Sequence, residues 1–142
     1  MKVDIYVDGS CDNKKQQTGG GYGSVLIFEN GTRIKLSAYI PGNCTNNIAE
    51  MTAIKESLSY LNKSHIVTIY TDSQLMIGYF TLGWKRKDFD LRKLAKLVDK
   101  ELNKHNTKFV KVKGHSGICY NEMADKLALQ GYLSKNPTLF IE

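Results

Sequence analysis

The spacing at which hydrophobic residues recur along the chain changes twice within the first 70 positions. These changes restrict the possible folds more than any other feature of the sequence. Residues 3–7, 22–28 and 33–40 are typical of β-strands, whereas from Ile48 onward apolar residues recur at intervals of three and four, as on one face of a helix. A dense apolar run over 66–70 then predicts a strand that is buried on both faces. The chain therefore requires a sheet that combines a hairpin with strands connected through helices.

Turn and capping signals complete the expected order of elements. Asn30-Gly31 predicts a hairpin, because both residues tolerate positive φ, and Thr45, Asn46 and Asn47 are candidate caps of the first helix. Further helices are predicted over 74–80, 91–102 and 124–133, and a short strand over 109–112. We expect an α/β fold with a mixed five-stranded sheet. Its first three strands are antiparallel, the first, fourth and fifth are parallel, and helices cover both faces.

Composition narrows the class of protein further. The 142 residues suit a single domain over 1–142, and 42% hydrophobic with 24% charged residues excludes disorder, collagen and coiled coil. No apolar run is long enough to cross a membrane, and Asp4 and Asp8 oppose a signal peptide, so a cytoplasmic protein is expected. The net charge of +6 is compatible with a polyanionic partner.

Four acidic residues lie at the ends of predicted elements. Asp8 follows the first strand, Asp72 follows the fourth, Glu50 lies in the first turn of a helix, and Asp125 lies near the start of the last helix. Taken singly, such residues are usually turn formers or favourable charges at a helix start. At the carboxyl ends of parallel strands they can converge, and converged carboxylates need a cation to neutralise them. Oxygen ligands suit Mg²⁺, and two such ions can cleave a phosphodiester.

Six short motifs favour a role in catalysis for these acids over a purely structural role. They are Asp8-Gly9-Ser10-Cys11, Gly20-Gly21-Tyr22-Gly23, Thr45-Asn46-Asn47 with Glu50, Thr71-Asp72-Ser73-Gln74, Gly114-His115-Ser116-Gly117, and Asn121-Glu122 with Asp125. With these motifs in this order and on these elements, the chain resembles the type 1 ribonuclease H family across nearly its whole length. Each motif alone is weak, and the combination is specific.

The resemblance implies a metal-dependent endonuclease that hydrolyses the RNA strand of RNA–DNA hybrids, leaving 5′-phosphate and 3′-hydroxyl ends. It implies two Mg²⁺ ions, for which Mn²⁺ can substitute, held by Asp8, Glu50, Asp72 and Asp125. By the same resemblance Asp8 bridges both ions, Asp125 helps to hold the ion that activates water, and Glu50 and Asp72 hold the other. The family's mobile active-site histidine corresponds to His115, whose expected role is proton transfer or help with product and metal release.

The resemblance also implies that the RNA strand is recognised through its 2′-hydroxyl groups. The matching positions are Thr45, Asn46, Asn47, Gln74 and the backbone near Cys11. Amide side chains both donate and accept, as a hydroxyl partner requires. Asn46 and Asn47 could equally serve only as helix caps, and the two roles are compatible.

The segment after the third acid is too short for the basic protrusion of longer family members. It holds Trp84, which is either core filler or a surface that stacks on DNA sugars, followed by Lys85-Arg86-Lys87. These basic residues either contact the phosphates of the DNA strand or only solubilise a loop. We therefore expect weak, salt-sensitive substrate binding.

The cysteines and the other histidines carry weaker signals. Cys11, Cys44 and Cys119 are expected in loops near the motifs, either as a soft-metal site or as exposed thiols, and their odd number argues against a disulfide framework. His65 and His105 are interpreted as structural.

Two other classes of function remain as alternatives. One is a binding module of the same fold without catalysis, which the presence of all four acids opposes. The other is an integrase or Holliday-junction nuclease, which the hydroxyl-reading positions and the Gly114–Gly117 loop disfavour. A monomer is expected, and the sequence indicates no protein partner.

Overall fold

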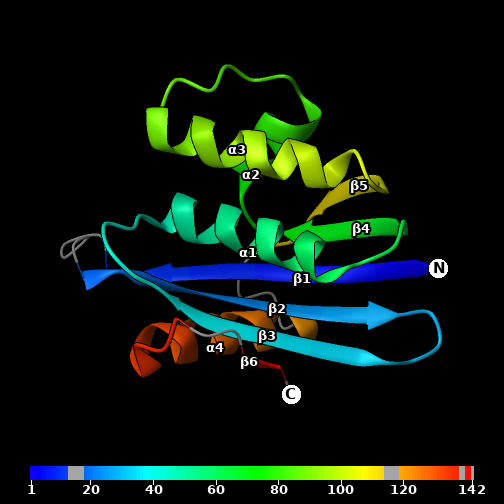
Figure 1. Cartoon of the computed structure of the whole chain (residues 1–142), viewed down its shortest axis with the longest axis horizontal. Coiled ribbons are helices and arrows are strands. Elements are labelled where there is room, and N and C mark those ends of the chain that lie inside the picture. Colours follow the sequence, from blue (N-terminus) through cyan, green and yellow to red (C-terminus); the bar gives the residue numbers. More distant parts are fainter. Residues whose placement is uncertain (13–17, 114–118, 138–139, 142) are drawn as a thin grey trace.

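The computed structural model describes residues 1–12, 18–113, 119–137 and 140–141. A six-stranded sheet in the order β5-β4-β1-β2-β3-β6 forms its centre. α1, α2 and α3 lie on one face of this sheet and α4 lies on the other (Figure 1). The elements in chain order are β1 (Lys2–Cys11), β2 (Gly20–Phe28), β3 (Arg33–Ile40), α1 (Asn46–Tyr60), β4 (Ile66–Thr71), α2 (Gln74–Thr81), α3 (Phe89–Leu102), β5 (Asn106–Lys111), α4 (Cys119–Ser134) and β6 (Phe140–Ile141).

The expected mixed sheet is confirmed in its first five strands. β1, β2 and β3 are antiparallel neighbours, and β1, β4 and β5 are parallel. The expected count of five strands was too low by one, because β6 pairs two residues with β3. Two residues are too few to show a period, so no sequence pattern marks this strand. β5 also begins three residues earlier than expected, at a polar segment that lies at the edge of the sheet.

The hairpin between β2 and β3 is formed as Asn30-Gly31 predicted. Gly31 adopts a φ of 89°, and its N–H donates to the carbonyl of Phe28 over 2.9 Å. The side chain of Asn30 accepts a hydrogen bond from the N–H of Thr32, at 3.0 Å. Turn chemistry therefore sets the register of the two strands.

The larger core lies between the sheet and α1. Val3, Ile5 and Val7 of β1 are almost wholly buried, and they belong to the same cluster as Met51 and Ile54 of α1. α1 is itself covered by α3 on its other side (Figure 1). Because α1 is sandwiched between two layers, it is buried over a wider arc than the single apolar face expected from its period.

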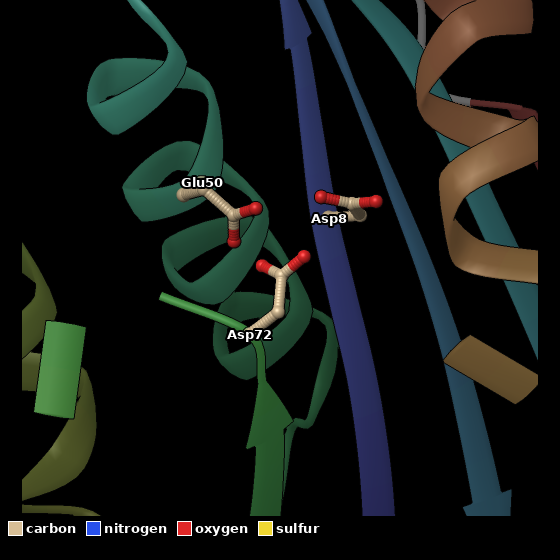
Figure 2. Close-up of side chains that lie close together, drawn as sticks. All are labelled: Asp8, Glu50 and Asp72. Atoms are coloured by element: carbon tan, nitrogen blue, oxygen red, sulfur yellow. The ribbon is translucent and has the colours of Figure 1, made fainter. Parts of the chain in front are cut away.

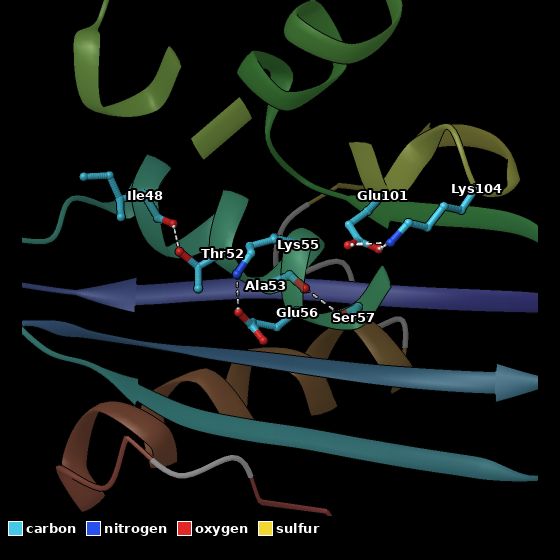
Figure 3. A network of polar contacts seen from close by, with 8 residues as sticks. All are labelled: Ile48, Thr52, Ala53, Lys55, Glu56, Ser57, Glu101 and Lys104. Atoms are coloured by element: carbon cyan, nitrogen blue, oxygen red, sulfur yellow. Dashed lines mark hydrogen bonds and ion pairs between the residues drawn. The ribbon is translucent and has the colours of Figure 1, made fainter. Parts of the chain in front are cut away.

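Two hydroxyl side chains within α1 are satisfied by the helix backbone (Figure 3). Thr52 donates to the carbonyl of Ile48 over 2.7 Å, and Ser57 donates to the carbonyl of Ala53 over 2.6 Å. Ser57 is fully buried, so bonding to its own helix avoids the cost of an unsatisfied polar group. These contacts let α1 carry polar residues into the interior.

α4 covers the opposite face and approaches β2 at Gly23. A Cβ at this position would lie 2.4 Å from the carbonyl oxygen of Ala124 and 2.5 Å from the nitrogen of Ala128, both backbone atoms that cannot move aside. The absence of a side chain therefore permits the close contact between strand and helix. Nearby, Val25 packs against Leu127 in a smaller second cluster.

Within the described residues, no helix combines the length and the apolar character that a membrane span requires.

Candidate active site

The parallel pairing of β1 with β4 places Asp8 and Asp72 at the same edge of the sheet. Tyr6 and Tyr70 are the last aligned partners of the two strands, and each aspartate follows its tyrosine by two residues. The N–H of Ser73 donates to Oγ1 of Thr71 over 3.1 Å, which fixes the turn that carries Asp72. Register and turn together bring two acids from distant parts of the chain side by side.

Glu50 reaches this edge because α1 lies directly on β1 at Gly9. A Cβ on Gly9 would lie 2.5 Å from the backbone nitrogen of Glu50 and 2.6 Å from the carbonyl carbon of Ala49. Only glycine permits so close an approach. The N–H of Gly9 points into the cluster and donates to Oδ1 of Asp8 at 2.9 Å and to Oε1 of Glu50 at 3.3 Å. The sequence placed the end of the first strand before Asp8 and did not predict this contact, but β1 continues through Gly9 to Cys11, so Gly9 lies within the strand.

The three carboxylates of Asp8, Glu50 and Asp72 converge. One oxygen from each residue lies within 4.8 Å of the others, and the side chains point toward one another (Figure 2). Glu50 is 6% exposed and Asp8 is 9% exposed, so water can screen their mutual repulsion only weakly. In the part of the chain that the structure describes, this is the one group of acids, cysteines or histidines arranged to hold a metal ion.

Burial and mutual repulsion perturb the protonation of these acids. Burial, together with the charge of Asp72, raises the pKa of Asp8 to about 6, although hydrogen bonds from Glu50 and from the N–H of Gly9 oppose the rise. The pKa of Glu50 is raised well above its ordinary value, first by burial and then by its contact with Asp8. Without a cation, burial and mutual repulsion therefore disfavour the ionised forms of both carboxyl groups.

Asp125 approaches the same cluster from α4, on the other face of the sheet. A hydrogen bond between the two carboxyl groups contributes to the raised pKa of Asp8, so Asp125 lies within reach of that residue. It does not belong to the tighter group formed by the other three acids. The structure thus brings all four predicted acids to one edge, with Asp8 between the α1 side and the α4 side.

The donor set fits a hard divalent cation. All candidate ligands are carboxylate oxygens, which Mg²⁺ and Mn²⁺ accept. Among the described residues no hydrogen-bond donor reaches the buried Oε2 of Glu50. An ionised carboxylate oxygen in such a position needs a positive partner, and a metal ion would provide one.

The predicted hydroxyl-reading residues surround the acids. Thr45 is the N-cap of α1 and accepts a hydrogen bond from the N–H of Ile48 at 3.2 Å, whereas Asn46 and Asn47 are exposed. Thr45 therefore serves as the cap, and neither asparagine side chain is needed for that role. Cys11, at the end of β1, donates from Sγ to Oδ1 of Asn46 at 3.3 Å. Gln74 is exposed in the first turn of α2, two residues after Asp72.

Trp84 is both packed against the protein and partly exposed, so it has features of a core residue and of a stacking surface. A Cβ on Gly78 would meet the indole ring at 2.0 Å, so the ring packs tightly on α2 at a position that lacks a side chain. The residue is nevertheless 43% exposed. The residue is therefore anchored and still presents an aromatic surface.

Arg86 does not belong with its two basic neighbours. Its guanidinium group donates to both carboxylate oxygens of Asp99 in α3, at 2.6 and 3.1 Å, and to the carbonyl of Tyr79 in α2 at 3.1 Å. This fork-like pairing and the bond to Tyr79 use three of the five N–H donors of the guanidinium group. Lys85 and Lys87 are exposed. The sequence grouped Arg86 with Lys85 and Lys87 as a candidate phosphate contact, whereas in the structure its side chain holds α2 and α3 together.

The remaining titratable residues are placed as follows. His115 and its loop lie outside the described residues. His105 accepts a hydrogen bond from the N–H of His65 at 3.1 Å, in agreement with a structural role.

The expectation that all three cysteines lie in loops was wrong for two of them, because Cys11 ends β1 and Cys119 begins α4. Cys44 is buried and Cys119 is exposed.

A mixed sheet that gathers carboxylates at the ends of its parallel strands defines a class of α/β protein suited to divalent-metal chemistry. Comparison with known proteins identifies the particular family: the RNase H family model matches residues 1–132. A ribonuclease H from Clostridium botulinum is 37% identical over 141 residues, covering 89% of this chain and 93% of the relative. The chain therefore belongs to the RNase H family, whose members are endoribonucleases that use a divalent metal.

Solved structures agree with this assignment. RNase H1 from the halophilic archaeon Halobacterium salinarum superposes with a TM-score of 0.77 at 25% identity, covering 94% of this chain and 99% of that one. LC11-RNase H1, whose structure was determined in complex with an RNA/DNA hybrid, gives a TM-score of 0.75 at 23% identity, covering 93% and 97%. The second likeness supports the fold alone.

The raised pKa of Asp8 leads to a prediction for the metal-free protein. The folded state binds a proton at Asp8 more tightly than the unfolded chain does, so stability falls as pH rises from about the ordinary pKa of 3.8 to about 6. In EDTA, Asp8→Asn should therefore be more stable than the parent at pH 7, by on the order of 1–3 kcal/mol, and no more stable near pH 4. Urea unfolding across this pH range measures the difference. Asp4→Asn, on the same face of β1, is the control, and a pH-independent gain in Asp8→Asn would contradict the prediction.

Proposed function

We propose that this chain hydrolyses the RNA strand of RNA–DNA hybrids as an endonuclease, by a two-metal-ion mechanism that leaves 5′-phosphate and 3′-hydroxyl ends. The observation that carries the proposal is the convergence of Asp8, Glu50 and Asp72, including a buried carboxylate oxygen without a donor. Membership of the RNase H family and the hybrid bound to a protein of the same fold support the choice of substrate.

The proposed cofactor is Mg²⁺, with Mn²⁺ as a substitute. Asp8, Glu50, Asp72 and Asp125 would hold two ions, which when bound activate water and stabilise the leaving oxygen of the phosphodiester. The protein's own contribution is to fix the carboxylates in advance. The N–H of Gly9 orients Asp8 and Glu50, and the Thr71 turn orients Asp72. His115 is proposed to move a proton or to assist product release.

Substrate recognition is proposed to depend on side chains around the rim of the acid cluster. Asn46, Asn47 and Gln74 are exposed and would exchange hydrogen bonds with 2′-hydroxyl groups of the RNA strand. Thr45 and the backbone near Cys11 would complete this surface. The exposed face of Trp84 would stack on sugars of the DNA strand.

The proposal extends to the organisation of the protein. Residues 1–142 would act as one catalytic domain and as a monomer. Cytoplasmic location is proposed because all three cysteines are present as thiols, which a reducing compartment maintains.

A side-by-side cleavage assay tests the proposed function. Hybrid, duplex RNA and duplex DNA of the same sequence are incubated with the protein and Mg²⁺, and the products are sized and their ends analysed. Cleavage confined to the RNA strand of the hybrid is expected. Cleavage of duplex DNA would indicate an integrase or junction nuclease, and tight hybrid binding without cleavage would indicate a catalytically inactive binding module.

Removal of one acid should abolish cleavage without unfolding the protein. Asp72→Asn preserves shape but cannot neutralise a cation, and it removes one repulsive member of the cluster. We expect near-complete loss of Mg²⁺-dependent cleavage with stability that is unchanged or higher. Asp4→Asn is the matched control and should cleave normally. Residual activity of Asp72→Asn above about a tenth of the parent rate, equivalent to about 1.4 kcal/mol, would show that Asp72 is not a required ligand.

The hydroxyl-reading surface predicts which sugars the enzyme needs. Replacing the ribonucleotides around one cleavage site by 2′-deoxy or 2′-O-methyl sugars should silence that site, because Asn46, Asn47 and Gln74 would lose their partners. Neighbouring sites in the same hybrid serve as internal controls on one gel. Undiminished cleavage at the modified site would refute recognition through 2′-hydroxyls.

Arg86 pairs with Asp99, whereas Lys85 and Lys87 are exposed. Substitutions at these positions should therefore have two distinct effects. Reversal of Lys85 and Lys87 to Glu should raise KM about five-fold at low salt, for two phosphate contacts of about 0.5 kcal/mol each, and should leave the free energy of unfolding unchanged. Arg86→Ala should instead lower that free energy by on the order of 1 kcal/mol, because Asp99 loses its partner. Steady-state kinetics across a salt series and urea unfolding separate the two effects. A double reversal with unchanged KM and salt slope would place the DNA strand elsewhere.

A further inference from the structure

Cys11 and Cys44 lie against each other beside the rim of the acid cluster. Cys11 ends β1 opposite Gly20, the first residue of β2. A Cβ on Gly20 would lie 2.6 Å from Sγ of Cys44 and 3.2 Å from Cβ of Cys11, so the two cysteines share the space that this glycine leaves open. Each cysteine also affects the pKa of the other. Two thiols that are 33 positions apart in the chain thus lie side by side.

The two thiols differ in access and in acidity. Cys44 is fully buried, whereas Cys11 is partly exposed. Burial raises the pKa of both thiols, that of Cys44 to about 12, and the neighbouring Cys11 raises the pKa of Cys44 further. The Sγ of Cys44 donates to the carbonyl of Thr45 over 3.4 Å. Cys11 is therefore the thiol that a reagent in solution meets first. Cys44 is positioned behind it as the second, resolving thiol.

Cys11 also contacts a residue proposed to read the substrate. Its Sγ donates to Oδ1 of Asn46 at 3.3 Å. A sulfur that has entered a disulfide carries no proton and cannot make this donation. The chemical state of Cys11 is thereby connected to the orientation of an amide group at the nucleic-acid surface.

We propose that Cys11 and Cys44 are a thiol modification site that forms a reversible disulfide with low-molecular-weight disulfides, such as glutathione disulfide, as the oxidant. In the first exchange the Cys11 thiolate bonds to one sulfur of the external disulfide, whose other half leaves as a thiol. In the second exchange the Cys44 sulfur, after losing its proton, bonds to Cys11 and releases the second external thiol. The protein loses two electrons and two protons, and the external disulfide gains them.

The expected consequence concerns binding of substrate, and this part rests on the proposed function. With the disulfide formed, Asn46 loses the donor that holds its carbonyl oxygen, and the segment before α1 is tied to the end of β1. We expect KM for the hybrid to rise several-fold while kcat remains within about two-fold, because the metal ligands are not altered. Reduction with dithiothreitol should restore the original KM.

The disulfide itself is measured without reference to activity. The full chain is equilibrated in glutathione buffers of increasing oxidised fraction, quenched with acid, alkylated and mapped by mass spectrometry. Loss of two hydrogen atoms in a cross-linked pair of peptides containing Cys11 and Cys44 is expected, with Cys119 remaining alkylated. Exclusively glutathione-capped cysteines, or three unmodified thiols at the most oxidising ratio, would overturn the proposal.

Two serine variants complete the test. Cys119→Ser should form the disulfide like the parent, since Cys119 is exposed at the start of α4. Cys44→Ser should be unable to form it and should instead keep glutathione on Cys11 under the same oxidising conditions, while circular dichroism verifies its fold. A disulfide that forms without changing KM would refute the connection to Asn46. Failure of the reduced protein to cleave any hybrid would refute the proposed function and leave the mass-spectrometric result to decide the disulfide.

Discussion

The close contact between β1 and α1 at Gly9 is the constraint on which the site depends. It presses the backbone of Glu50 against the end of a central strand, so the Glu50 carboxylate is buried beside Asp8. Burying these charges side by side is unfavourable, and the raised pKa values of both residues express that cost. The hydrophobic layers on both sides of β1 must therefore supply the stability that the carboxylates remove. In return the site is fixed in advance, and a bound cation would meet ligands that need no rearrangement.

Most of the fold could be predicted because its signals are local. The alternation in β1, the Asn30-Gly31 turn and the three–four spacing in α1 each specify an element without reference to distant residues. β6 could not be predicted, because a two-residue strand exists only through its pairing with β3. The polar start of β5 was missed for a related reason. An edge strand that pairs on one side needs few apolar residues to be held there.

In the candidate site, too, residues marked by local motifs could be predicted, whereas contacts between distant segments could not. The four acids were found in the sequence because motifs mark them, and strand register then explains why Asp8 and Asp72 meet. The contacts of Arg86 with Asp99 and of Cys11 with Cys44 join segments that nothing in the sequence connects. A run of like charges such as residues 85–87 is especially misleading, because neighbours in sequence can point to different partners. Side-chain roles of this kind follow from tertiary packing alone.

The pairing of Arg86 also bears on how a short member of this family meets its substrate. The segment from 82 to 88 crosses from α2 to α3, and Trp84 and Arg86 anchor it, the first on Gly78 and the second on Asp99. Anchoring removes conformational freedom from Lys85 and Lys87, so less entropy is lost when they contact a phosphate. Under the proposed function, Arg86 would contribute to binding without touching the nucleic acid, by holding its neighbours and Trp84 in a fixed position. A compact, rigid contact of this kind would compensate in part for the shorter reach of a chain whose α2–α3 connection carries no extended basic segment.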